Sequence, residues 1–205
     1  MLYEMRTYTF AAGGAAEFER GFGEALEHRN KYSQLGGFWR TELGPLNEVV
    51  HIWPYEDLNQ RTEARAASRQ DAHWPPKHDA EVLRQESEIL MPAPFMDPWD
   101  GPQALGAVYE LRSYTYRPGK MPEVIKRWSE VIEYRKTLSP LAGAWHTDIG
   151  TLNKWVHLWA YDSLDHRASV RAEAVKGGKW PASTRDLLLD QETKILIPAS
   201  FSPMH

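Results

Sequence analysis

The chain repeats itself once, and this duplication limits what it can fold into. Three segments recur without a gap, each 106 positions after its counterpart, as Tyr109 follows Tyr3. They are YEMRTYT at 3–9 and YELRSYT at 109–115, TELGPLNEVVHIWPYEDL at 41–58 and TDIGTLNKWVHLWAYDSL at 147–164, and QESEILMPAPF at 85–95 and QETKILIPASF at 191–201. So long a period indicates tandem domains. We expect module 1 at 1–96, a Pro- and Gly-containing linker at 97–107 and module 2 at 108–205.

Each module shows the same sequence of periodic segments. Alternating and apolar patterns in module 1 predict a strand at 3–10, a helix at 15–32, strands at 38–43 and 48–53, a helix at 58–68, a short third helix after 74–76 and a strand at 86–91. Module 2 repeats this pattern, with Met121 and Pro122 beginning its first helix. The order β-α-β-β-α-β predicts an α+β, ferredoxin-like module with its first and third strands adjacent.

A ferredoxin-like sheet carries helices on one face and leaves the other face bare. The second module offers an equivalent bare face, so the two sheets should pack about a pseudo-two-fold axis. We therefore predict an intramolecular pseudo-dimer with an eight-stranded, barrel-like core.

Composition removes several classes of partner. The net charge of −4 and the lack of a Lys/Arg stripe argue against nucleic acid. No apolar run approaches the roughly 20 residues that cross a bilayer, and the first ten residues do not resemble a secretory signal. The absence of Cys excludes disulfides and thiolate ligands. These features predict a cytoplasmic protein without a membrane partner.

Candidate site residues follow from strand alternation. If Val50 and Ile52 pack against the helices, His51 and Trp53 face the space between the sheets. Applied to both modules, this assignment fills the space with Glu4, Arg6, Tyr8, His51 and Trp53 and with Glu110, Arg112, Tyr114, His157 and Trp159. Such groups must satisfy one another or surround a ligand, because burying them unpaired is costly.

Three interpretations of this set remain open. Glu4, Arg6 and Glu86 could form a buried ion-pair network with a purely structural role. Alternatively, His51 could act as a general acid or base on an enol, phenol or carbonyl in a pocket walled by Trp53 and Trp39, and His157 likewise beside Trp159 and Trp145. Metal binding by the two histidines across the axis has weaker support, since no local metal-ligand spacing is present.

Several repeated polar residues have a simpler explanation. Arg61 and Arg65, with Arg167 and Arg171 in module 2, are one helical turn apart. They could bind an anionic partner, but they are expected on the solvated face of an amphipathic helix. Asn47 and Asn153 suit the geometry of a tight turn. No nucleotide-binding motif is present, so no cofactor is expected.

The motifs E-[ML]-R-[TS]-Y, G-x-L-N and V-H-[IL]-W, present in both modules, resemble those of the NIPSNAP family. The resemblance covers nearly the whole chain except the linker. It implies a dimeric α+β barrel, a fold shared with small-molecule monooxygenases, isomerases and haem-degrading enzymes. It does not imply a reaction, because the family has no settled one.

The function we expect is binding of an aromatic or polyketide-like ligand between the sheets, by a binding protein or a cofactor-independent enzyme. Arg6 and Arg112 would hold an anionic oxygen, while His51 and His157 would move protons. The alternatives are a non-catalytic scaffold and, from fold analogy, a haem-binding protein. The two sites need not be equivalent, because Arg40, Glu42 and Glu88 correspond to His146, Asp148 and Lys194. Assembly beyond the pseudo-dimer is left open.

Overall fold

The computed structural model describes all residues, 1–205, and gives both modules the predicted element order. Module 1 consists of β1 (Leu2–Phe10), α1 (Gly14–Asn30), β2 (Gly37–Leu43), β3 (Glu48–Tyr55), α2 (Leu58–Ser68) and β4 (Val82–Pro92). Module 2 consists of β5 (Val108–Tyr116), α3 (Met121–Ser129), α4 (Ile132–Lys136), β6 (Leu141–Ile149), β7 (Lys154–Tyr161), α5 (Leu164–Lys176), a short 3-10 helix (Arg185–Leu187) and β8 (Leu188–Pro198). None of the helices has the length and apolar character needed to cross a membrane.

Three local predictions were wrong. The chain does not form a helix after Trp74-Pro75-Pro76, and β4 begins at Val82, four residues earlier than expected. The first helix of module 2 is also interrupted, because Val131 leaves the helical region (φ −126°) between α3 and α4. The turn prediction is confirmed, since Asn47 and Asn153 both have left-handed backbone conformations (φ 57° and 60°).

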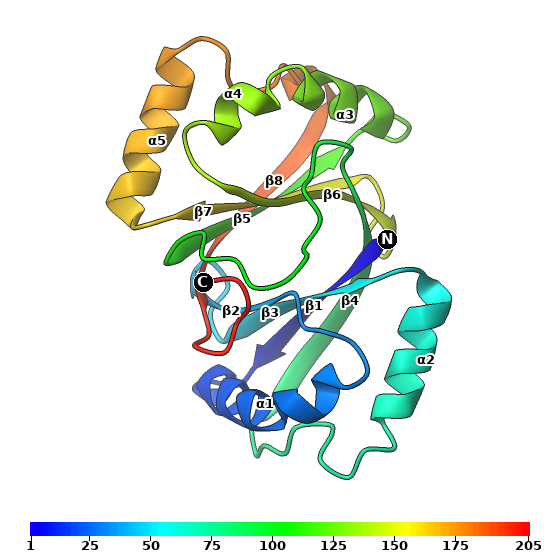
Figure 1. Ribbon diagram of the computed structural model, residues 1–205. Coiled ribbons are helices and arrows are strands. Elements are labelled where there is room, and N and C mark those ends of the chain that lie inside the picture. Colours follow the sequence, from blue (N-terminus) through cyan, green and yellow to red (C-terminus); the bar gives the residue numbers. More distant parts are fainter.

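The eight strands form a closed antiparallel barrel in the order β1-β3-β2-β8-β5-β7-β6-β4. The first and third strands of each module are neighbours, as predicted, and the modules join where β2 pairs with β8 and where β4 pairs with β6. Figure 1 shows the helices of module 1 on one outer side of the barrel and those of module 2 on the opposite side. The intramolecular pseudo-dimer is therefore confirmed.

The interior of the barrel holds a large apolar core, and here the predicted facing of the strands was wrong. Met5, Val50 and Ile52 pack inside the barrel together with their module 2 counterparts. The alternate residues His51 and Trp53 lie on the outer face, beneath the helices. The reason is that the middle of the space between the sheets is enclosed, so side chains without polar demands fill it at low cost, while the charged residues of the inner face gather at the open end of the barrel.

Two tryptophans expected at the ligand site instead fill the barrel. Trp39 and Trp145 are fully buried in its interior. Each indole folds back over a glycine two residues earlier, so that a Cβ at Gly37 or Gly143 would overlap the ring. These glycines provide the room that two indoles need in a closed core.

The segment at 97–107 packs against one end of the barrel. Trp99 lies edge-on to Tyr3 and Trp145, with ring centroids 5.2 and 5.4 Å apart, and its Nε1 donates a hydrogen bond to the carbonyl of Ala142 at 2.6 Å. Met204 is completely buried in the same cluster. The segment therefore contributes side chains to the shared core as well as connecting the modules.

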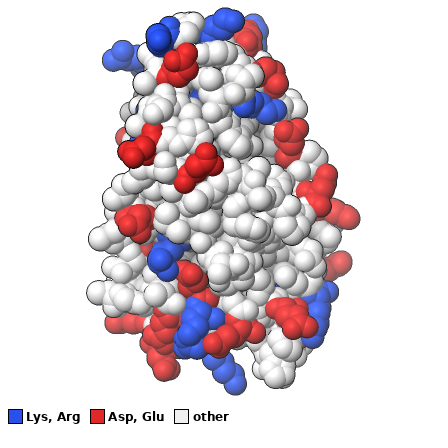
Figure 2. Space-filling model, turned by 60° about the vertical axis from the view of Figure 1, so that its left-hand side comes forward, with Lys and Arg blue, Asp and Glu red and all other residues white.

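Charged side chains of both signs are mixed on the surface. Figure 2 shows one face on which Lys and Arg alternate with Asp and Glu toward the two ends, while the middle of that face carries few charged residues. No continuous stripe of one sign is visible on it.

Candidate functional site

Each module has a pocket between the outer face of its sheet and its helices. The pocket of module 1 has a volume of about 320 Å³ and that of module 2 about 380 Å³, at the lower end of the range for small-molecule sites. The predicted residues Arg6, Tyr8, His51 and Trp53 line the first pocket. Arg112, Tyr114, His157, Trp159 and Glu110 line the second. The candidate residues thus do come together, but in two separate pockets on opposite outer faces of the barrel.

A buried carboxylate anchors the pocket of module 1. Glu4 has no exposed surface, and its Oε1 accepts hydrogen bonds from Arg6 Nη1 at 2.6 Å, Arg61 Nη2 at 2.7 Å and Ser87 Oγ at 2.7 Å. Burial alone would raise the pKa of Glu4, but the bonds from Arg61 and Ser87 and the nearby charges of Arg6 and Arg65 lower it to about 2. Glu4 is therefore ionised at neutral pH.

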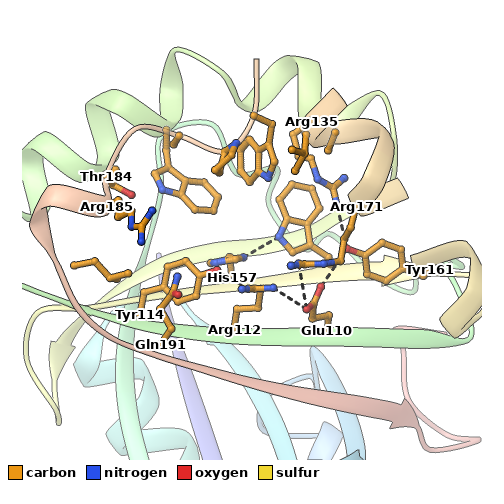
Figure 3. A pocket seen from close by; sticks show the side chains of 18 residues that line it. Glu110, Arg112, Tyr114, Arg135, His157, Tyr161, Arg171, Thr184, Arg185 and Gln191 are labelled. Atoms are coloured by element: carbon orange, nitrogen blue, oxygen red, sulfur yellow. Dashed lines mark hydrogen bonds and ion pairs between the residues drawn. The ribbon is translucent and has the colours of Figure 1, made fainter. Parts of the chain in front are cut away.

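Module 2 repeats this arrangement (Figure 3). Glu110 Oε1 accepts from Arg112 Nη1 at 2.9 Å and from Arg167 Nη2 at 2.6 Å, and Arg171 lies 3.5 Å away. Burial opposes ionisation of Glu110, but Arg167 and Arg112 together hold its pKa below the usual value. The same carboxylate–arginine cluster is thus built twice.

Two sequence predictions about this cluster were wrong. Arg61 and Arg65, with Arg167 and Arg171, do not simply form a solvated helix face, since they turn inward to the buried glutamates. Glu86 is not part of the network: it pairs with Arg84 at the surface, and the adjacent Ser87 takes the expected position. Strand alternation explains the second error, because Arg6 is paired with Ser87 in the ladder and shares its face.

The tyrosine beside the cluster is arranged to donate a hydrogen bond into the pocket. Arg6 Nε donates to the hydroxyl oxygen of Tyr8 at 2.7 Å, and Arg112 Nε donates to that of Tyr114 at 2.6 Å. Each phenol oxygen is thereby used as an acceptor, which leaves its own proton free. Burial raises the pKa of Tyr114 although Arg112 opposes this effect, so the phenol is neutral at neutral pH.

The histidine provides a second free donor. Trp53 Nε1 donates to His51 Nδ1 at 2.7 Å, and Trp159 Nε1 donates to His157 Nδ1 at 2.8 Å. Because an indole nitrogen is only a donor, Nδ1 must be the acceptor, and the proton of the neutral ring is on Nε2. Neither buried Nε2 has a partner within the protein.

Both histidines are neutral in the pocket. Burial and the charge of Arg6 lower the pKa of His51 to about 3. Burial and the charges of Arg112 and Arg135 likewise hold the pKa of His157 well below its usual value. Each imidazole therefore offers an N–H group to a ligand at physiological pH and is a weak base while the pocket is empty.

The same hydrogen bond makes the histidines poor metal ligands. An Nε2 that carries the ring proton has no lone pair available for iron or zinc, so the pocket does not fit axial ligation of haem by His51 or His157. The structure shows no group of three or more His, Cys, Asp or Glu side chains placed to hold a metal ion. The weaker alternative from the sequence, in which His51 and His157 approach each other across the axis, does not occur, since each histidine lies in its own pocket.

Sequence reasoning missed a second arginine at each pocket. Arg29 Nη2 donates to the Tyr55 hydroxyl at 3.0 Å, its guanidinium lies 4.5 Å from the ring centroid of Trp53, and its buried Nη1 has no partner. Arg135 occupies the equivalent position in module 2, 4.0 Å from the centroid of Trp159. The signal was present, because this arginine is identical in both copies.

Aromatic rings complete the pocket walls. Phe22, Trp53 and Trp74 surround the first pocket, and Trp128, Trp159 and Trp180 the second. Trp74 and Trp180 each precede a cis proline. Together with the arginines, these rings give a pocket with flat apolar walls and a positively charged, donor-rich floor.

The match to known proteins agrees with the fold and the repeat. A family model described as NIPSNAP matches residues 3–97 and again residues 109–203. The chain belongs to the NIPSNAP family. The human protein NipSnap homolog 3A is 32% identical over 217 residues, covering 100% of this chain and 86% of the relative. A NipSnap homolog of Dictyostelium discoideum is 31% identical over 207 residues, covering 96% and 87%.

A solved structure of low sequence identity is similar to this chain in its fold only. A protein of Lactobacillus acidophilus, provisionally described as a monooxygenase, superimposes with a TM-score of 0.68 at 11% identity, covering 97% of this NIPSNAP chain and 94% of that protein. At this identity the match supports the dimeric α+β barrel architecture and carries no information about the reaction.

Proposed function

We propose that each module of this NIPSNAP protein binds a small organic anion with a flat apolar body, such as an aromatic or polyketide-like acid. The proposal rests on two hydrogen-bond donors without a partner in the protein, the Tyr8 hydroxyl and the His51 Nε2–H. Both lie in a pocket lined by more arginines than carboxylates. Two neutral donors beside fixed positive charge favour a carboxylate, enolate or phenolate oxygen. The ligand would lie beneath the helices, and not between the sheets.

The walls and the floor have separate roles in this proposal. Trp53 and Trp74 would pack on the faces of the ligand, which is where aromatic side chains contribute most. Arg29, with an unpartnered Nη1, would attract the anionic end. Glu4 would not contact the ligand, because its role is to hold Arg6 so that Arg6 polarises Tyr8.

The same donors also suit a reaction without a cofactor. In such a reaction an enolisable ligand would lose its α-proton to water entering the pocket, the C–H electron pair would move to the carbonyl oxygen, and water would return a proton to another carbon. The Tyr8 hydroxyl and His51 Nε2–H would stabilise the intermediate oxyanion. A bound anion would also raise the pKa of His51, because it offsets the charge of Arg6. Isomerisation of an enolisable compound is therefore the reaction class to assay first.

A purely structural role for the polar residues is the second candidate, and the buried Glu4 cluster favours it. Arg61 and Arg65 on α2 reach Glu4 on β1, so the cluster fixes the helix on the sheet. On this view, replacing His51 and His157 by Ala would lower stability and change no binding or turnover.

Calorimetric titration tests the binding proposal. The ligands would be two- and three-ring aromatic carboxylates and 1,3-dicarbonyl acids, each with its neutral alcohol or amide as a matched control. We expect the acids to bind more tightly than their neutral controls, and the double variant Tyr8→Phe, Tyr114→Phe to lose most of that preference. Equal affinity for acids and neutral controls, or no binding of any acid, would contradict the proposal.

A further inference from the structure

Two ion pairs cross the lines along which the modules close the barrel. Glu48 on β3 accepts from Lys194 on β8, with Oε2 and Nζ 2.5 Å apart. Lys154 on β7 donates to both oxygens of Glu88 on β4, at 2.9 and 2.7 Å. All four side chains are largely buried, with 8–19% of each exposed, so solvent screens these pairs less than ordinary surface pairs.

The pseudo-two-fold axis relates the two ion pairs to each other, so they occupy equivalent positions at the two junctions. The repeat offset relates Glu48 to Lys154 and Glu88 to Lys194. At both positions the carboxylate belongs to module 1 and the ammonium to module 2. This division differs from the pockets, where the charged residues Glu4, Arg6 and Arg29 recur unchanged in module 2.

A barrel built from two copies of the same module would replace these opposite-charge pairs with like-charge pairs. Two copies of module 1 would place Glu48 against Glu88 at both junctions, and two copies of module 2 would place Lys154 against Lys194 at both. Like charges held together in a partly buried junction are destabilising, whereas opposite charges fix which surfaces pair.

We propose that these four residues specify the partner of each sheet, so that a module 1 sheet is closed only by a module 2 sheet. The surface recognised is the strand edge and barrel opening around Glu48 and Glu88, and its partner is the lysine-bearing counterpart on a second module. The chain thereby excludes barrels formed from two module 1 sheets, or two module 2 sheets, of neighbouring copies.

The surroundings of the pairs support a built contact. Thr9 Oγ1 donates to Glu48 Oε1 at 3.2 Å, which helps to orient that carboxylate. The turn residue Gly150 lies against the Glu88 side chain, where a Cβ would be 3.0 Å from Cγ. The charge also changes sign between the modules at a third position beside this end of the barrel, where Arg84 of module 1 corresponds to Asp190 of module 2.

Charge reversal in the full chain tests this proposal. Glu48→Lys with Glu88→Lys places lysine against lysine at both junctions, and we expect the melting temperature to fall by about 5–10 °C. Adding Lys154→Glu and Lys194→Glu restores opposite charges and should return the melting temperature to within about 2 °C of the original. A milder cycle, Glu88→Lys alone and then with Lys154→Glu, applies the same test to one junction should the double variant fail to fold.

The matched control is the exposed pair Arg20 and Glu24 on α1, whose exchange of charges should leave melting unchanged within about 1 °C. The loss caused by Glu88→Lys should also grow at low ionic strength. If the fourfold variant melts no higher than the double variant, or if Glu88→Lys and Lys154→Glu act additively, the four charges do not specify the pairing and the proposal fails.

Discussion

The two faces of the same strands have opposite characters. On β1, Tyr3 and Met5 point into the barrel and are part of an apolar core, while Glu4 and Arg6 point outward into an ionic cluster. On β3, Val50 faces inward and His51 faces the pocket. Both of these strands are covered on their two faces, but by the other sheet on one face and by helices on the other.

This difference shows where a buried polar group is tolerated. The inner face is enclosed by the two sheets along its apolar part, and its charged pairs, Glu48 with Lys194 and Glu88 with Lys154, lie at the open end of the barrel. The outer face lies beside α2 or α5, and long arginine side chains from these helices, themselves partly exposed, reach the buried glutamates. We therefore expect inner-face substitutions to act on stability and pocket substitutions to act mainly on binding.

The largest effect should come from emptying part of the inner core. Trp39→Ala removes a fully buried indole, and we expect a loss of about 3–5 kcal/mol in the free energy of unfolding. Trp145→Ala should cost a similar amount. Urea denaturation measures both, and a loss below about 1 kcal/mol would show that the barrel interior is not the main core.

Disrupting the outer cluster should come next. Glu4→Gln removes the negative charge that Arg6, Arg61 and Arg65 share, and we expect a loss of about 3 kcal/mol at pH 7. Glu86→Gln on the neighbouring strand β4 is the control and should change stability by less than about 0.5 kcal/mol, since its only ion pair is exposed. Equal effects of the two variants would count against a buried cluster.

Acid should weaken the outer face before it affects the inner one. The pKa of His51 is about 3 in the folded protein and about 6.5 when unfolded, so protons bind the unfolded state first and stability falls as the pH drops below about 6.5. Glu4, with a folded pKa of about 2, adds a further loss as the pH falls below about 4.5. At pH 5.5 we expect a loss of about 1–3 kcal/mol relative to pH 7.5.

The histidines can be separated from the carboxylates by substitution. In the double variant His51→Gln, His157→Gln the decline between pH 6.5 and 4.5 should largely disappear, while the decline below 4.5 remains. Thermal melting across this range measures both windows. An unchanged profile in the variant would mean that the histidines are not buried as neutral groups.

The smallest effect on stability should accompany a clear effect on binding. Tyr8→Phe removes a hydroxyl that accepts one hydrogen bond, from Arg6 Nε, while Arg6 keeps its bond to Glu4, so we expect a loss of about 1–2 kcal/mol in stability. The affinity of the module 1 pocket for an aromatic carboxylate should fall roughly tenfold, the effect of losing one hydrogen bond to a charged group. Fluorescence titration in a Tyr114→Phe background isolates this pocket.

Much of the molecule follows from the sequence. The ungapped repeat determined two modules, the order of their strands and the pairing of their sheets. The period of two along a strand determined that Arg6 and Tyr8 share a face, as do His51 and Trp53. Turn chemistry determined the left-handed backbone of Asn47.

Only the tertiary structure decided which face of the sheet carries the pocket. Both faces of β3 are apolar enough to be buried, since Val49 and Val50 are adjacent, and periodicity does not say which neighbour is a helix. The decision depended on long-range packing, in which Trp39 and Trp145 both pack against Trp99 inside the barrel and Arg61 and Arg65 reach Glu4 from α2. Such contacts join residues far apart in the chain, so the local pattern does not encode them, and the same side chains became an outer pocket instead of an inner one.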